Sequence, residues 1–270
     1  MTDPWANRDY LRGTQYKTDT NLAARQSIYA YQQPRIDLAA RVLDLAAPGP
    51  SDTVVDVGCG NGMYLAELAR RGFRSRVLGV DLSFGMLAAT RQRLAATRVP
   101  VGAAPAPAAL ANADATALPL RDGAGDLAFA VHMLYHVPDP VDALRELRRV
   151  TRPGGRVVIV LNGAGHLREL RAAVAAARGD AAPVGERVRL DDGESLARSL
   201  FLRVDRHDFT AELRVPGPGP IVDYVRSLAG TRREADPERV ARTAAATFPR
   251  TSDGHYAITS HSGCLICEVG

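Results

Sequence analysis

The stretch that decides the fold is Val54-Val55-Asp56-Val57-Gly58-Cys59-Gly60-Asn61-Gly62, in which three glycines at alternate positions follow a β-branched run. The apolar residues of Thr53–Val57 predict a buried strand, and the pattern from Met63 to Arg71 predicts a helix that ends before Gly72. Glycine lets the backbone turn sharply and lets a ligand approach it, and the helix start then offers free N–H groups. This stretch predicts a site for a nucleotide-like ligand.

An acid follows the next predicted strand, Arg76–Val80, at the spacing where a carboxylate binds the hydroxyls of a ribose. The glycine turn and Asp81 together could bind either a dinucleotide or S-adenosylmethionine (SAM). The turn lacks the G-x-G-x-x-G spacing of dinucleotide sites. Asp56 would also repel a pyrophosphate and attract a cationic amino group, so the residues favour SAM.

The rest of the chain alternates apolar runs with helical patterns, which is typical of a parallel sheet with crossover helices. We predict further strands at 108–113, 126–131, 156–161, 209–215 and 257–269. We predict further helices at 84–96, 142–150, 167–178, 221–228 and 237–247. Val99–Pro107 is predicted as a loop, and Arg152-Pro153-Gly154-Gly155 as the turn that stops a helix. The fold class is therefore α/β, with a mostly parallel, Rossmann-like sheet.

Four parts are expected along the chain. Residues 1–50 hold two helical patterns, Asn21–Tyr31 and Pro34–Ala46, that we expect to cover the site. Residues 51–215 form the core, with helices on both faces of its sheet. Residues 216–250 form a small helical lid inserted into the last hairpin, and residues 251–270 complete the core with an antiparallel last strand.

Composition narrows the functional classes. The chain has 270 residues and a formal net charge of +4, and its arginines are scattered rather than clustered, which makes a nucleic-acid partner unlikely. We find no apolar run of about 18 residues, no secretory leader and only three cysteines, so we expect a cytoplasmic protein without membrane contact. Cys264 and Cys267 fall in a strand pattern and are predicted to be buried. No metal site is expected, and a homodimer is compatible with the sequence.

Five motifs in order resemble those of the class I SAM-dependent methyltransferases, of the type whose members act on ubiquinone precursors and natural products. Besides the glycine turn and Asp81, they are Asn112-Ala113-Asp114-Ala115, the segment His132-Met133-Leu134-Tyr135-His136-Val137-Pro138-Asp139, and Arg152–Gly155. They cover Ser51–Leu161.

This resemblance implies that the chain binds SAM and releases S-adenosylhomocysteine (SAH). Asp56, Gly58 and Gly60 would hold the methionine part, and Asp81 with Leu82 the ribose and adenine. The full set of implied cofactor contacts is Tyr16, Arg25, Asp56, Gly58, Cys59, Gly60, Asp81, Leu82, Met86, Asp114, Ala115 and Val131. Asp114 would hold the adenine edge; alternatively it caps the turn Ala115–Pro119.

Candidate catalytic residues follow the fourth strand of the core, because ligands gather at the carboxyl ends of strands in open α/β sheets. They are His132, Tyr135 and His136. A general base is needed only where the acceptor is protonated, and histidine titrates near neutral pH. Either histidine could instead only fix the loop. Asn162 and His166, after the fifth strand, could meet the acceptor or serve as loop residues.

The resemblance implies methyl transfer to oxygen or nitrogen of a small-molecule acceptor, in specialised metabolism. Three alternatives remain open: methylation of a carbon atom, methylation of RNA, and a SAM-binding protein without catalysis. The absence of an (N/D)-P-P-(Y/F) motif disfavours RNA. Fold alone does not exclude the non-catalytic protein.

Overall fold

The computed structural model describes residues 4–99, 108–178, 187–228 and 250–270, together with 238, 239, 242, 243, 246 and 248. Its centre is an eight-stranded sheet in the order β1-β7-β8-β6-β5-β2-β3-β4. The strands are β1 (Gln32–Gln33), β2 (Val54–Val57), β3 (Val77–Asp81), β4 (Ala108–Asn112), β5 (Gly125–Val131), β6 (Thr151–Asn162), β7 (Arg203–Val215) and β8 (Tyr256–Glu268).

The five strands from β4 to β6 in this order run parallel. Strand β8 pairs antiparallel with both β6 and β7, which confirms the prediction of a mostly parallel sheet with an antiparallel last strand. Parallel strands place their carboxyl ends at one edge of a sheet. The segments that follow β2, β3, β5 and β6 therefore meet there.

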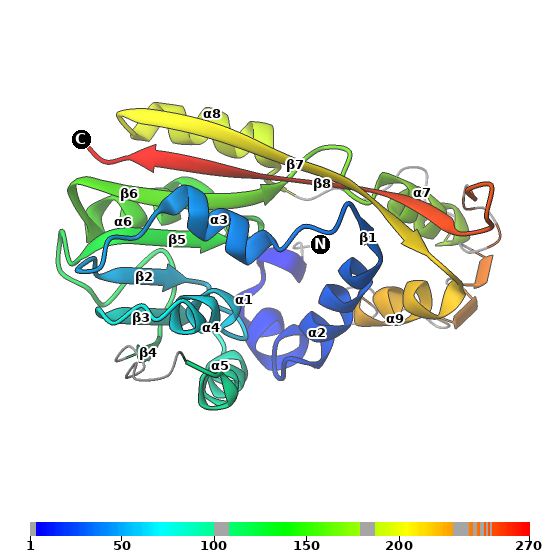
Figure 1. Cartoon of the computed structure of the whole chain (residues 1–270), viewed down its shortest axis with the longest axis horizontal. Helices are drawn as coiled ribbons and strands as arrows, with labels where there is room; N and C mark the ends of the chain where they lie inside the picture. The colour runs from blue at the N-terminus through cyan, green and yellow to red at the C-terminus, as the bar shows by residue number, and fades with distance from the viewer. Residues whose placement is uncertain are drawn as a thin grey trace.

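Helices cover both faces of the sheet (Figure 1). The described helices are α1 (Arg8–Tyr10), α2 (Thr20–Ser27), α3 (Leu38–Ala46), α4 (Met63–Arg70), α5 (Phe84–Ala96), α6 (Pro140–Val150), α7 (Arg168–Arg178), α8 (Leu190–Leu200) and α9 (Pro218–Leu228), with short turns η1 (Pro4–Ala6), η2 (Leu11–Gln15), η3 (Ile28–Tyr31) and η4 (Leu134–His136). Helices α3, α4 and α5 share one apolar core with the sheet, and α6 and α8 share another.

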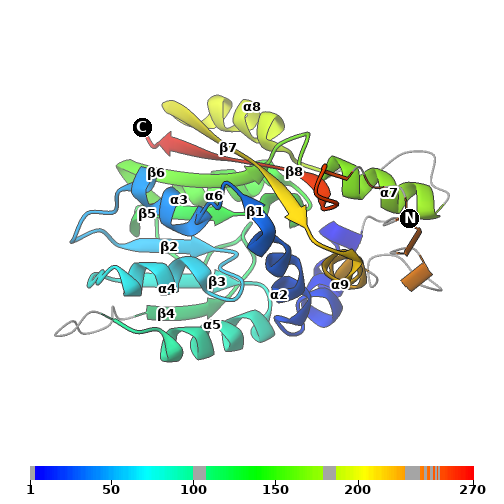
Figure 2. The same cartoon turned by 45° about the vertical axis from the view of Figure 1, so that its right-hand side comes forward.

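The N-terminal segment and the insertion lie together at the carboxyl edge of the sheet. Helix α2 contacts α9, which follows β7 within the predicted lid range 216–250 (Figures 1 and 2). Helix α7 packs in a third apolar cluster with α9 and the adjoining ends of β7 and β8. Among the described residues, no helix is long and apolar enough to cross a membrane.

Two sequence predictions on the outer half of the sheet were incomplete. Strand β7 begins at Arg203, six residues before the predicted Phe209, because it pairs with β8 along its whole length. Helix α8 was not predicted. Its Gly193 lies so close to β6 that an added Cβ would approach Leu161 to 2.2 Å. Most of the predicted loop Val99–Pro107 and of the predicted helix 237–247 lies outside the described residues, and the division of the chain into four parts stays a prediction.

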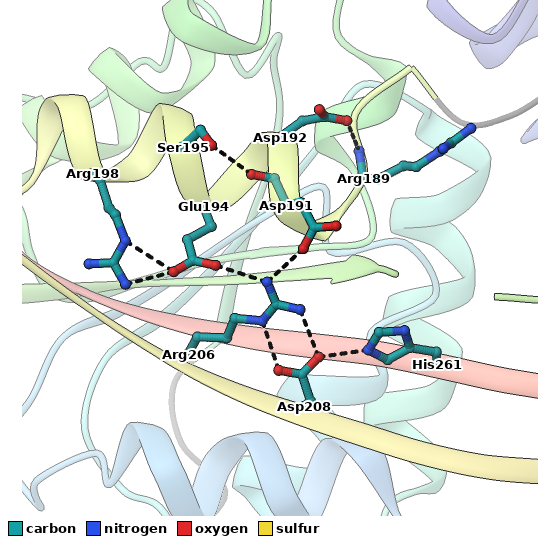
Figure 3. A network of polar contacts seen from close by, with 9 residues as sticks. All are labelled: Arg189, Asp191, Asp192, Glu194, Ser195, Arg198, Arg206, Asp208 and His261. Atoms are coloured by element: carbon teal, nitrogen blue, oxygen red, sulfur yellow. Dashed lines mark hydrogen bonds and ion pairs between the residues drawn. The ribbon is translucent and has the colours of Figure 1, made fainter. Parts of the chain in front are cut away.

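Charged side chains explain how the early part of β7 is held. Figure 3 shows Arg206 between α8 and Asp208: its Nη1 lies 2.7 Å from an oxygen of Asp191 and 2.9 Å from one of Glu194, and its Nε lies 2.7 Å from Asp208. His261 of β8 contacts the same carboxylate of Asp208 at 2.6 Å. One guanidinium thus ties the helix to the strand.

Replacing Arg206 with leucine should lower the free energy of unfolding by about 1–2 kcal/mol, because a network loses its central cation and leaves three carboxylates facing one another. Urea unfolding measures the change. Arg203→Leu is the matched control, since Arg203 is exposed and, within the described part of the chain, forms an ion pair only with Asp205 of its own strand. Equal losses in both variants would show that the network adds nothing.

Candidate functional site

The glycine turn has the backbone geometry that its sequence predicts. Gly58, Gly60 and Gly62 have φ angles of +70°, +56° and +77°, in the left-handed region that favours glycine. A Cβ on Gly58 would approach that of Met133 to 2.7 Å, whereas a Cβ on Gly60 would meet only a leucine methyl at 3.4 Å. The backbone at Gly60 is therefore open to a ligand.

Two carboxylates stand beside this turn. Asp56 is 2% exposed, and within the described part of the chain its Oδ2 has no hydrogen-bond partner. Burial, and then the charge of Asp81, raises the pKa of Asp56 to about 7. Asp81 accepts hydrogen bonds from the backbone N–H of Gly60 at 2.9 Å and of Ser83 at 2.8 Å, while burial keeps its pKa above the usual range. A buried carboxylate oxygen without a partner is costly unless a ligand supplies one.

One cavity of about 820 Å³ extends from this turn to α7 and α9. That volume lies within the range of about 300–1,000 Å³ that is usual for small-molecule sites. The structure brings together around it every residue predicted for the site: Tyr16, Arg25, Asp56, Gly58, Cys59, Gly60, Asp81, Leu82, Met86, Asp114, Ala115, Val131, His132, Tyr135, His136, Asn162 and His166.

Not all of these side chains face the cavity equally. Cys59 is 7% exposed and its Sγ lies 4.0 Å from Oγ1 of Thr90 on α5, so its thiol points into the core. Met86 is 1% exposed. Asp114 accepts hydrogen bonds from the backbone N–H and hydroxyl of Thr116 and pairs with Arg8. Burial would raise the pKa of Asp114, but these contacts hold it below its usual range. Asp114 therefore caps a turn, as one of the two sequence interpretations expects, and its contact with the adenine edge stays a prediction.

His136 holds the N-terminal segment over the cavity. Its Nδ1 lies 3.1 Å from the carbonyl oxygen of Trp5 and therefore carries the proton, so its Nε2 accepts from the hydroxyl of Tyr16 at 2.7 Å. Arg25 of α2 donates to that same hydroxyl at 3.0 Å and lies over the rings of Trp5 and Tyr16. Burial lowers the pKa of His136 to about 3. Both of its nitrogen atoms are used for fixing the loop.

His166 is fixed in the same way on the other side of the cavity. Its Nδ1 accepts from the backbone N–H of His261 at 3.1 Å, so its Nε2 donates to the hydroxyl of Tyr29 at 2.9 Å. Burial lowers its pKa to about 3, with the charges of nearby groups adding to the effect.

His132 differs from both. It has φ +50°, a strained conformation for a residue with a Cβ. Its Nδ1 is buried without a partner among the described residues, and burial lowers its pKa to about 4. The half-buried ring lines the cavity. Of the three histidines, His132 alone keeps an unused ring nitrogen within the described structure.

Comparisons with known proteins agree with this arrangement. A model of the methyltransferase domain matches residues 55–159. The malonyl-[acyl-carrier protein] O-methyltransferase of Serratia marcescens is 31% identical over 202 residues, which span 72% of this chain and 69% of that protein. An uncharacterized methyltransferase of Mycobacterium tuberculosis is 30% identical over 217 residues, 78% of each protein. The chain belongs to the class I SAM-dependent methyltransferases.

Solved structures share the fold over most of this chain. The YcgJ protein from Bacillus subtilis superposes with a TM-score of 0.60 at 18% identity, covering 86% of this chain and 98% of that one. Phosphoethanolamine N-methyltransferase 2 of Haemonchus contortus, solved with SAM, gives a TM-score of 0.59 at 21% identity. The match covers 97% of this chain and 60% of that one. Membership of the SAM-dependent methyltransferase family confirms SAM, predicted from the glycine turn and Asp56, as the cofactor.

The turn of this methyltransferase fits the charges of SAM. The unpartnered Oδ2 of Asp56 suits its α-ammonium group, and the open backbone at Gly60 suits its approach. Arg25 has a buried Nη1 without a partner in the described structure, which suits the α-carboxylate. Sequence reasoning did not predict two residues that hold the histidines around the cavity, Trp5 beside His136 and Tyr29 beside His166. The one signal for Trp5 was that it is the only tryptophan of the chain.

Buried ionisable groups of the methyltransferase make its stability depend on pH. The folded pKa values of His132, His136 and His166 lie well below the unfolded value of about 6.5, so the stability they contribute is complete above pH 6.5 and is lost as pH falls. Asp56 and Asp81, whose pKa values are raised, act in the opposite direction, Asp56 between about pH 4 and pH 7.

Three histidines that gain a proton against two carboxyl groups that lose one leave a net uptake of about one to two protons on unfolding between pH 4.5 and 6.5. The free energy of unfolding should therefore rise by up to about 2.7 kcal/mol per pH unit in this window. Urea unfolding at pH 5.0, 6.0 and 7.0 measures the slope. A flat or falling profile would contradict the burial of the three histidines.

Proposed function

We propose that this methyltransferase transfers the methyl group of SAM to an oxygen or nitrogen atom of a small molecule bound in the cavity. One observation supports this most: the same cavity is lined by Asp56 and Asp81 of β2 and β3, by His132 directly after β5, and by one face of α7. An acceptor small enough to enter could thus lie beside the cofactor.

Residues of this chain would hold SAM by its charges. Asp56 would accept from the α-ammonium group, Arg25 would donate to the α-carboxylate, and Asp81 would accept from the ribose hydroxyls. When bound, SAM would supply a methyl group from its positively charged sulfur and would be left as SAH, while an acceptor O–H or N–H would give up its proton to solvent. The protein contributes mainly by aligning the two molecules.

His132 would orient the acceptor through its unused ring nitrogen. With a pKa of about 4 it is neutral at physiological pH, so it can accept a hydrogen bond from an acceptor O–H or N–H. The same low pKa makes it a weak base for a phenol or an alcohol. Tyr135, whose ring lies edge-on to His136 at 4.5 Å, lines the same end of the cavity.

One relative is named as an O-methyltransferase, and one protein of the same fold is named as an N-methyltransferase. Both names give acceptor atoms of the proposed kind. Incubation with methyl-labelled SAM and a panel of phenols, amines, carboxylic acids and bulk RNA tests the proposal. Transfer to an oxygen or nitrogen atom of a small molecule supports it, and transfer to carbon alone would contradict it. Transfer to RNA alone, or tight SAM binding without transfer to any small molecule, would contradict it.

A further inference from the structure

One face of α7 and the residue before it line the cavity. The lining residues are spaced by three or four positions, as expected for one side of a helix: Leu167, Leu170, Arg171, Val174, Ala175 and Arg178. Figures 1 and 2 show α7 at the opposite end of the molecule from β2, β3 and β4. This face therefore bounds the part of the cavity beyond the cofactor turn.

The face combines apolar and cationic side chains. Leu170 is 1% and Val174 5% exposed, whereas Arg171 and Arg178, two helical turns apart, are only half-buried. Arg171 donates to the carbonyl oxygen of Ala164 at 2.8 Å, which fixes the position of its guanidinium group. Its charge reaches the site, because it is one of the causes that lower the pKa of His166, after burial and His132.

Carboxylates line the cavity elsewhere. Among the described lining residues, the acids are Asp37 at the start of α3, Asp56 and Asp81 at the carboxyl ends of β2 and β3, and Asp114 after β4. Arg187 adds a further cation to the lining, where it donates to the carbonyl oxygens of Val137 and Pro138, just after η4, at 3.2 and 3.0 Å. Arg8, Arg12, Arg25 and Arg35 also line the cavity, so its cations are not confined to α7, but the charged residues that α7 contributes to the lining are both arginines. A low-dielectric cavity lined by one sign of charge favours a ligand of the opposite sign.

We propose that the methyl acceptor carries an acidic group on an apolar body, and that Arg171 and Arg178 bind this group. Carboxylate, sulfonate and phosphate share the chemistry that a guanidinium recognises, namely a negative charge spread over oxygen atoms that accept two parallel hydrogen bonds. Leu167, Leu170 and Val174 would contact the apolar body. This inference rests on the proposed function, since it names the class of acceptor for the same cavity.

Matched acids and amides test the anchor. The full chain, saturated with SAH, is titrated by calorimetry with 4-phenylbutyrate, 2-naphthylacetate and dodecanoate, and with the primary amide of each. We expect at least one acid to bind about tenfold more tightly than its amide, with the preference falling as salt increases. Arg171→Met should weaken binding of that acid about tenfold, Arg171→Lys should weaken it less, and binding of the amide should change less than twofold.

Arg168→Met is the control on the same helix, because Arg168 is exposed and pairs with Glu169. It should leave the acid preference unchanged. Equal affinity for acids and amides, no binding of any acid, or equal losses in the Arg168 and Arg171 variants would each overturn the anchor. SAH affinity, measured first in every variant, separates these outcomes from a failure of the proposed function, which would appear as a wild-type protein that binds SAH but methylates no small molecule.

Discussion

Replacing Asp56 with asparagine is expected to lower the affinity for SAM by about 100-fold or more, as measured by calorimetric titration at pH 8. The carboxylate is buried at the turn with one oxygen unpartnered, so the α-ammonium group would be its counterion. Breaking such a buried ion pair costs about 3–5 kcal/mol, and each 1.4 kcal/mol is tenfold in affinity.

The same substitution should stabilise the cofactor-free protein at pH 8. The folded pKa of Asp56, about 7, lies above the unfolded value of about 3.9, so its ionised form destabilises the fold increasingly as pH rises from 4 to 7. Removing the charge should therefore raise the free energy of unfolding by up to about 4 kcal/mol at pH 8 and change it little at pH 4. Urea unfolding at the two pH values measures this.

Asp52→Asn serves as the control for Asp56→Asn. Asp52 lies in the turn before β2, outside the cavity lining, where it accepts from the backbone N–H of Gly49 at 2.8 Å. Its replacement should leave SAM affinity unchanged. If Asp56→Asn bound SAM as tightly as the wild type, the methionine end of the cofactor would have to lie elsewhere.

Replacing His132 with asparagine should lower kcat about 100-fold with the best acceptor of the panel, while SAH affinity changes less than threefold. Loss of a positioned proton acceptor or orienting group typically costs 10²–10⁴-fold in rate. Asparagine tolerates the left-handed conformation that His132 adopts at φ +50°, so the backbone should stay in place. Single-turnover kinetics with labelled SAM measures the effect.

His207→Asn is the matched control, because His207 lies on β7 outside the cavity lining. It should leave kcat unchanged. Because the pKa of His132 is about 4, the wild-type rate should not fall with the ionisation of His132 as pH decreases from 8 to 6. An unchanged kcat in His132→Asn would show that this histidine, like His136, only fixes the loop.

The glycine turn could be predicted from the sequence because its requirements are local. Positive φ at Gly58 and Gly60 and the approach of a ligand both depend on residues within one strand–turn–helix unit. Asp81 could be placed because it ends the neighbouring parallel strand. Strand β8 could be predicted because its apolar residues alternate with polar ones, and its antiparallel direction because it closes a hairpin after the insertion.

Contacts between distant segments could not be predicted in this way. His136 meets Trp5 and Tyr16, which lie 131 and 120 positions away, and only the path of the N-terminal segment brings them together. The sequence therefore left His136 open as a base, whereas the structure uses both of its nitrogen atoms. The early half of β7 was missed for a related reason: its residues are charged, and long-range pairing with β8 makes them a strand.

The most direct measurement is calorimetric titration of the wild-type chain with SAH between pH 6 and pH 8.5, in buffers of different ionisation enthalpy. If the α-ammonium group binds the ionised carboxylate of Asp56, affinity should rise by about tenfold per pH unit below the folded pKa of about 7 and level off above it, with a proton released on binding below pH 7. A pH-independent affinity without proton release would contradict the assignment of Asp56, and absence of binding at every pH would contradict the cofactor site at the glycine turn.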